Sequence, residues 1–285
     1  MDSIATLTLY NIIIVILSFL LMVVVWRMSH QPSRYVFAAI QVLTIVLMAS
    51  YTFDVSSPRL EVKLFFNNFE YLSMVFIPAL VLVIAFQLTG RTAWLTSRRL
   101  LPLFGISSFF YLALATNNSH HLFYESVTLA TDPLYSFVTV RGPLFYLFFL
   151  VALAELIIAS ILVWHANRDL GLAQKRRMKI LIAAFLCPTI MTFVGILTEQ
   201  WVPSEMLVIT GILLSSVLLF VGTFGFELFR MLPFTFDGTV KTLKDGVLIV
   251  DEHQRLLYTN PALQGLIGLP EGKELSGENL REILP

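Results

Sequence analysis

The sequence predicts an all-α membrane protein, a seven-transmembrane helix bundle, followed by a short α+β segment at the C-terminal end. Composition is the first observation behind this fold class. Hydrophobic residues make up 57% of the 285 residues and charged residues only 13%, whereas soluble domains carry about 25% charged residues. The second observation is that apolar runs of about 17 to 25 residues, the length needed to cross a bilayer, recur along the chain.

Seven such runs can be drawn, and together they predict a membrane domain over residues 1–226. The first run follows Asp2 rather than a basic region, and no small-residue cleavage site comes after it. We therefore expect a retained helix and not a signal peptide. The fourth run is the shortest. The predicted spans are residues 6–26, 35–53, 64–88, 100–116, 143–164, 180–197 and 206–226.

The basic residues of the loops predict the orientation. Loops after the first, third and fifth spans contain ten Lys or Arg, whereas the opposite loops contain only Arg59, Lys63 and Arg141. Loops rich in Lys and Arg stay on the cytoplasmic side of a membrane. We therefore expect a multi-pass protein of the cell membrane with its N-terminus outside and its C-terminus in the cytoplasm.

The longest outer loop, residues 117–142, has the composition of a β-hairpin. Residues 125–129 and 134–140 are rich in Val, Thr, Tyr and Phe, and Thr131-Asp132-Pro133 separates them. Such a pattern is typical of two strands joined by a turn. The hairpin is either a lid over the bundle or a passive connector, and the sequence leaves both open.

Two carboxylates fall inside the spans, where an unpaired charge costs several kcal/mol. Glu70 lies near the outer end of the third span, and Asn67 and Tyr71 share a helix face with it by their spacing. This face either lines a polar cavity open to the outside or joins helices by hydrogen bonds. Glu155 lies about 18 Å along its helix from Pro143, near the midplane, and the favoured interpretation is a protonated carboxyl bonded to a neighbouring helix.

Several other chemistries lack the residues they need. His120 and His121 follow the fourth span, but no third ligand has metal spacing, so no metal site is expected. The last span contains no lysine for a retinal Schiff base, and no two spans carry histidines at matched depth for a haem. The formal net charge of +0 gives no basic face for nucleic acid. No catalytic set is readable, so we expect no enzyme within this chain.

The C-terminal tail changes from lipid-like to soluble sequence. A linker helix is predicted over residues 227–244, followed by strands at 246–250 and 255–259. Asn260-Pro261 then supplies an N-cap and a first-turn proline for a further helix. This order resembles the start of a PAS domain, a sensor and relay module of bacterial signalling proteins. Residues 245–285 would cover only part of that domain, so we expect the chain to be a piece of a longer protein.

The order of landmarks along the whole chain resembles the seven-transmembrane N-terminal sensor region of histidine kinases, also found on some diguanylate cyclases. One departure is that Pro78 is followed by Ala79, where family members often have a second proline. The matching pieces are Asn68-Phe69-Glu70-Tyr71, Pro78, Thr89-Gly90-Arg91, Thr116-Asn117, His120-His121-Leu122-Phe123, Gly142-Pro143-Leu144-Phe145-Tyr146, Gln174-Lys175-Arg176-Arg177, Pro188 and residues 230–250.

The resemblance implies a receptor-like bundle with an outward pocket for a small molecule of unknown identity. Its occupancy would be passed to a cytoplasmic PAS domain and then to a kinase, in a two-component system that works as a homodimer. The pocket residues implied by position are Asn68, Glu70, Tyr71, His120, His121 and Tyr146.

Two alternatives remain at this stage. A transporter or channel would use Glu70 and Glu155 as an ion or proton path, although an odd number of spans without inverted repeats argues against it. A passive anchor would only hold a downstream enzyme at the bilayer.

Overall fold

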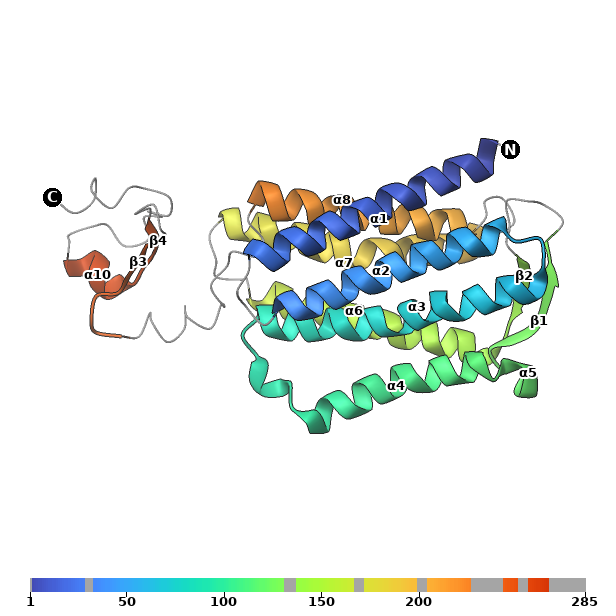
Figure 1. The fold of residues 1–285 in the computed structure, drawn as a ribbon. Coiled ribbons are helices and arrows are strands. Elements are labelled where there is room, and N and C mark those ends of the chain that lie inside the picture. Colours follow the sequence, from blue (N-terminus) through green and yellow to red (C-terminus); the bar gives the residue numbers. More distant parts are fainter. Residues whose placement is uncertain are drawn as a thin grey trace. The chain divides into compact units, whose positions relative to one another are not determined.

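The chain consists of two compact units, Met1–Met231 and Leu232–Pro285, which are described separately. The computed structural model describes residues 2–28, 33–130, 137–166, 172–198, 204–226, 243–250 and 256–266. The first unit is a bundle of long helices with a small hairpin at one end, and the second contains two short strands and a helix (Figure 1).

Long apolar helices make up the first unit. Among the described residues, six are long and apolar enough to cross a membrane, and Leu207–Val221 forms a shorter apolar helix within α8. The protein is therefore a mostly helical membrane protein with six to seven candidate transmembrane helices. The long helices are α1 (Asp2–Met28), α2 (Ser33–Ser56), α3 (Leu60–Leu88), α4 (Ser97–Ala115), α6 (Pro143–Ala166), α7 (Leu172–Thr198) and α8 (Ser204–Phe226).

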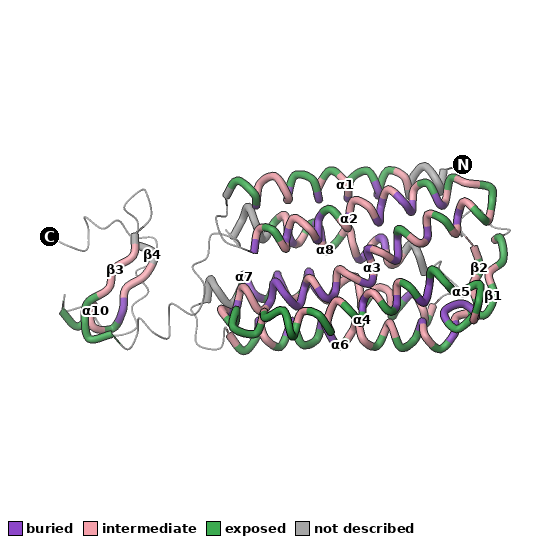
Figure 2. Tube along the Cα trace, turned by 60° about the horizontal axis from the view of Figure 1, so that its bottom comes forward, coloured by how far each residue is buried: buried purple, intermediate pink, exposed green. Residues whose placement is uncertain are grey.

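Helix α3 lies at the centre of the bundle. It packs against α2, α6 and α4, and buried residues follow one another along it (Figure 2). Helix α1 packs on α2 and α8, and α7 packs mainly on α8. Outer helix faces expose large apolar side chains such as Leu101, Leu150 and Ile161, as a bilayer environment requires.

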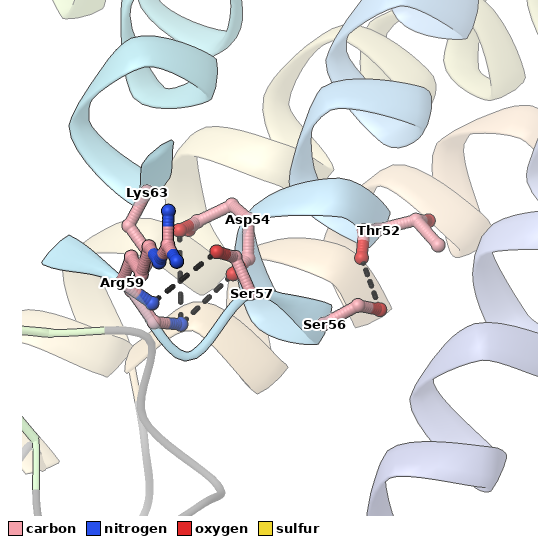
Figure 3. Close-up of polar contacts among 6 residues, drawn as sticks. All are labelled: Thr52, Asp54, Ser56, Ser57, Arg59 and Lys63. Atoms are coloured by element: carbon pink, nitrogen blue, oxygen red, sulfur yellow. Dashed lines mark hydrogen bonds and ion pairs between the residues drawn. The ribbon is translucent and has the colours of Figure 1, made fainter. Parts of the chain in front are cut away.

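A buried ion pair joins the ends of α2 and α3 (Figure 3). The Lys63 Nζ donates a hydrogen bond of 2.8 Å to the backbone carbonyl of Asp54 and lies 3.9 Å from the Asp54 Oδ1. Both side chains are almost fully buried. Two residues earlier on α2, the Thr52 Oγ1 accepts a hydrogen bond of 3.0 Å from the Asn11 Nδ2 of α1. These contacts join three helices at the same end of the bundle.

Pro188 explains how α7 and α8 are joined. A proline inside a helix leaves the carbonyl four residues earlier without its helical donor, and here that carbonyl belongs to Ala184. The Ser215 Oγ of α8 donates a hydrogen bond of 2.7 Å to this Ala184 oxygen. Gly211 permits the close approach, because a Cβ there would lie 2.9 Å from the Cα of Pro188 and 2.8 Å from the Cβ of Met191.

The outer loop folds as the hairpin that its composition predicts. Strand β1 (Tyr124–Leu129) pairs antiparallel with β2 (Phe137–Arg141), and Tyr124 lies opposite Arg141. The register shifts between Tyr124 and Ser126, so a bulge lies beside the first pair. The predicted turn at 131–133 and the first residues of the predicted second strand lie outside the described residues.

The second unit contains an antiparallel pair, β3 (Leu248–Val250) with β4 (Leu256–Thr259), followed by α10 (Pro261–Leu266). This is the hairpin and proline-started helix that the tail sequence predicts. The predicted linker helix at 227–244 lies outside the described residues except for its last two positions.

Asn260 holds the described part of this unit together. It is fully buried, and its Oδ1 accepts hydrogen bonds from the N–H of Val247 at 2.8 Å and of Leu263 at 3.0 Å. Its Nδ2 donates to the carbonyls of Asp245 at 2.8 Å and Leu243 at 3.3 Å. One amide therefore caps α10 and also fixes the segment that leads into β3.

The contact between Ser215 and Ala184 predicts a measurable loss of stability. Ser215→Ala leaves the Ala184 carbonyl without its donor, and interhelical hydrogen bonds in membranes contribute about 0.6 kcal/mol on average and up to about 1.7 kcal/mol. We expect a free energy of unfolding lower by about 1 kcal/mol, measured by denaturant titration in mixed micelles. Ser108→Ala is the control, because the Ser108 Oγ bonds only the Phe104 carbonyl of its own helix. Equal stabilities of the two variants would contradict this role.

Candidate functional site: a cavity beneath the hairpin

An aromatic cluster closes the hairpin end of the bundle. Phe123 is fully buried, and its ring centroid lies 5.2 Å from that of Tyr71 and 5.9 Å from that of Phe145, both in edge-to-face geometry. Phe110 and Leu114 of α4 belong to the same core. The residue just before β1 is therefore anchored between α3, α4 and α6.

Asn117 fixes the turn that leads to Phe123. It begins α5 (Asn117–His120), and its Oδ1 accepts hydrogen bonds from the N–H of Phe123 at 2.9 Å and of Tyr124 at 3.1 Å. Its Nδ2 donates to the Tyr124 carbonyl at 2.9 Å. A single buried amide thus satisfies three backbone groups at the start of the hairpin, where an unpaired group would be costly.

Gly142 closes the hairpin on its other side. Its N–H donates to the Phe123 carbonyl at 2.9 Å, and the Leu144 N–H donates to the Leu122 carbonyl at 3.0 Å. A Cβ at position 142 would lie 2.2 Å from that Leu122 oxygen, a distance that no side chain tolerates. The two backbone segments approach this closely only because residue 142 is glycine.

Beneath the hairpin, the bundle contains a partly open cavity of about 560 Å³, a volume within the range of small-molecule sites. Five helices line it, namely α2, α3, α6, α7 and α8, together with both strands of the hairpin. It extends along α3 from Glu70 to Ile84, a distance on the order of 20 Å at 1.5 Å per residue. The hairpin therefore lies against this cavity.

The polar groups of this cavity concentrate at the hairpin end. Glu70 and Tyr71 of α3 line it together with Tyr124 and Arg141, the first facing pair of the hairpin. Glu70 is 6% exposed and Tyr71 7%. The Arg141 guanidinium carbon lies 5.2 Å from the ring centroid of Phe145, within the range of a cation–π contact.

The Tyr124 hydroxyl is held in its neutral form. Burial raises the pKa of Tyr124 well above its ordinary value, and the adjacent Tyr71 and the charge of Glu70 act in the same direction. A hydrogen bond with the Asn67 side chain opposes them. Asn67, Glu70 and Tyr71 are all buried on one face of α3, and this face meets the hairpin.

The residues that the sequence placed in the pocket divide into two groups. Glu70 and Tyr71 line the cavity, whereas Asn68, His120, His121 and Tyr146 are not among its lining residues. The Asn68 Nδ2 bonds back to the Leu64 carbonyl of its own helix at 2.9 Å. Tyr146 is 48% exposed.

The two histidines belong to the turn before the hairpin. The His120 Nδ1 accepts a hydrogen bond of 2.9 Å from the Leu122 N–H, and its Nε2 lies 3.4 Å from the Thr116 Oγ1. His121 ends α5 in the left-handed conformation, with φ of 54°, which histidine adopts more often than most residues. His120 therefore supports the turn, and His121 is exposed.

Glu155 is buried but is not among the residues lining the cavity. It lies on α6 with 8% exposure, next to Leu156, which does line the cavity. The described residues contain no group of three or more His, Cys, Asp or Glu side chains that could hold a metal ion.

The sequence reasoning did not place Tyr124 or Arg141 in the pocket, although both line the cavity. Arg141 was counted only as an outer-loop charge, and Tyr124 was not singled out. Strand pairing sets Tyr124 opposite Arg141, and Tyr124 lies near enough to Glu70 for the charge of Glu70 to act on it. The sequence did contain a signal for these two residues. Successive side chains of a strand point to opposite faces, so alternate residues of a hairpin anchored between spans would face the bundle.

These features define a multi-pass helical membrane protein with an internal cavity beneath an anchored hairpin. Residues 11–233 match a family described as the N-terminal 7TM region of histidine kinase. Because this match covers most of the chain, the protein belongs to that family. No curated protein matches the chain significantly, and no PAS domain is detected in its tail.

The close contact at Gly142 predicts a severe defect from a single methyl group. Gly142→Ala forces the hairpin and α6 apart, because the new Cβ would overlap the Leu122 carbonyl. We expect a loss of at least 2 to 3 kcal/mol in the free energy of unfolding, roughly the cost of overpacking a tight site. Thermal unfolding in detergent measures this loss.

Gly105→Ala is the matched control. A Cβ at position 105 in α4 would meet nothing within 4 Å, and alanine favours a helix by up to about 1 kcal/mol over glycine. We expect this variant to be unchanged or more stable. If Gly142→Ala behaves in the same way, the close approach is not essential to the fold.

Proposed function

We propose that this chain is the membrane sensor module of a signalling histidine kinase, and that occupancy of the cavity beneath the hairpin is the signal it reports. The observation that carries the proposal concerns the elements that contribute the residues lining the cavity. These residues come from the hairpin at one end and from α8, the last helix that the structure describes before the C-terminal unit. A ligand in this cavity would therefore contact both the closing hairpin and the helix that leads to the output.

The contact between α7 and α8 supports a route for the signal. Pro188 and Ser215 both line the cavity, and Ser215 bonds the carbonyl that Pro188 leaves free. An occupant favours one packing of α7 against α8 only to the extent that it binds that packing more tightly than the other. We propose that this difference moves the end of α8.

The remaining parts of the proposal follow the family and the charge pattern. The N-terminus lies outside the cell and the C-terminal unit lies in the cytoplasm, as the loop basic residues indicate. The β3–β4 hairpin and α10 form the start of a PAS domain, with domain boundaries at 226 and 245. The parent protein works as a homodimer with a downstream kinase, and a diguanylate cyclase is the less favoured output.

The transporter alternative has little support in the site. Glu70 lines the hairpin end of the cavity, but Glu155 does not line it. Two carboxylates on one proton path would share a chamber or a chain of polar groups. Proton flux into liposomes that is abolished by Glu155→Gln would favour the transporter instead.

Kinase output tests the proposal directly. In the full-length parent protein in nanodiscs, we expect Glu70→Ala/Tyr71→Ala to change autophosphorylation by at least fivefold, the lower end of typical coupling between sites. Phe69→Ala is the control, because Phe69 is 39% exposed on the same helix and does not line the cavity. A passive anchor predicts equal phosphorylation of wild type and both variants.

Cysteine labelling tests the orientation. Cys187 is the only cysteine, so Cys187→Ser gives a background free of thiols. Ser126 in the hairpin and Thr92 between α3 and α4 are both exposed. In intact cells, we expect an impermeant maleimide to label Ser126→Cys, and to label Thr92→Cys only after lysis. The reverse pattern would place the hairpin in the cytoplasm.

A further inference from the structure

The cavity has a polar end and a long apolar end. Away from the hairpin, its lining is mainly aliphatic and aromatic, with side chains such as Val81, Ile84, Leu181, Phe185 and Leu219. Gln41 and Ser216 are uncharged polar exceptions in that region. The shape and polarity therefore match a molecule with one polar head and one extended apolar chain.

Hydroxyl groups along the walls do little to change this polarity. The Thr44 Oγ1 donates to the Ile40 carbonyl at 2.9 Å, and the Thr192 Oγ1 donates to the Pro188 carbonyl at 2.8 Å. The Ser215 Oγ donates to the Ala184 carbonyl. Because these donors are already engaged with the backbone, they present mainly carbon to the cavity.

The head end contains charges of both signs. Glu70 and Arg141 are the acidic and basic side chains that line the cavity among the described residues. A head with one net charge would be attracted by one of these two side chains and repelled by the other. A neutral head with hydroxyl groups can donate to the carboxylate and accept from the guanidinium at the same time.

A molecule with an apolar chain partitions from water into the bilayer. An apolar chain gains little by moving from lipid into a protein cavity, because lipid tails are as apolar as the cavity walls. Filling the cavity does restore contacts that its walls would otherwise lack. Selectivity among amphipaths must therefore come from the head.

We propose that the cavity binds a single-chain amphipath with a neutral, hydroxyl-bearing head, of the monoacylglycerol class. Its head lies among Glu70, Tyr124 and Arg141, and its chain extends between α3, α7 and α8. This inference rests on the proposed sensor role and adds the chemical class of the ligand.

Direct binding to the whole chain in nanodiscs tests the inference. The probe is radiolabelled 1-monomyristoylglycerol, and the competitors are myristic acid and tetradecylamine, which have the same chain length but a charged head. We expect saturable binding that unlabelled monomyristoylglycerol displaces at least tenfold better than either competitor. Absence of saturable binding, or stronger displacement by a charged competitor, would overturn the inference.

A matched pair of variants tests the location of the site. Ala152 lines the cavity, whereas Ala154 on the same helix is exposed and does not. We expect Ala152→Trp to weaken binding at least tenfold and Ala154→Trp to leave it unchanged. Equal binding by the two variants would place the amphipath elsewhere.

Charge variants keep the test decisive even if Ala152→Trp fails to fold. Glu70→Gln leaves Arg141 dominant, so myristic acid should gain at least tenfold in competition. Arg141→Gln leaves Glu70 dominant, so tetradecylamine should gain instead. Unchanged head selectivity in both variants would contradict the placement of the head.

The binding assay does not depend on kinase output. Binding of monomyristoylglycerol without any effect on autophosphorylation would contradict the sensor role and leave the site intact. Autophosphorylation that depends on Glu70 and Tyr71, together with no binding of the neutral amphipath, would contradict the ligand class alone.

Discussion

The structure depends on the rule that a polar group within a bilayer must find its partner inside the protein. At Pro188 the rule requires a donor for the Ala184 carbonyl, and Ser215 of the next helix supplies it. The buried Lys63 at the start of α3 also finds its partners inside the protein, because its ammonium group bonds the Asp54 carbonyl and lies beside the Asp54 carboxylate. Helix pairs are therefore joined at particular points rather than by apolar contact alone.

The hairpin follows from the same rule at the edge of the membrane. Asn117 satisfies the backbone where α5 turns into β1, and this turn inserts Phe123 between three helices. Gly142 then lets the returning strand meet the turn. With both ends fixed, Tyr124 and Arg141 face each other at the cavity, which Glu70 also lines. The polar head of the cavity is thus built from residues of the hairpin and of α3 together.

Sequence reasoning identified the class of fold because lipid-length apolar runs and loop charges are local signals. It also predicted the hairpin strands and the helix start at Asn260-Pro261, each marked by residues close together in the chain. Helical spacing correctly put Asn67 on one face with Glu70 and Tyr71, whereas the resemblance implied Asn68 as a pocket residue, and the Asn68 side chain bonds the Leu64 carbonyl of its own helix. Arg141 was missed because its position depends on pairing with Tyr124 across a turn. The resemblance implied both histidines as pocket residues, but His120 is engaged with its own turn.

Transmission of cavity occupancy to α8 is the central claim of this account. The most direct measurement is double electron–electron resonance between nitroxides at Trp164 and Val221, exposed residues of α6 and α8, in a Cys187→Ser background. With the cavity filled by the indole of Ala152→Trp, the distance distribution should shift relative to the unfilled protein, and Ala154→Trp should leave it unchanged. Superimposable distributions for all three proteins would show that α8 does not respond to the cavity, and would contradict the claim.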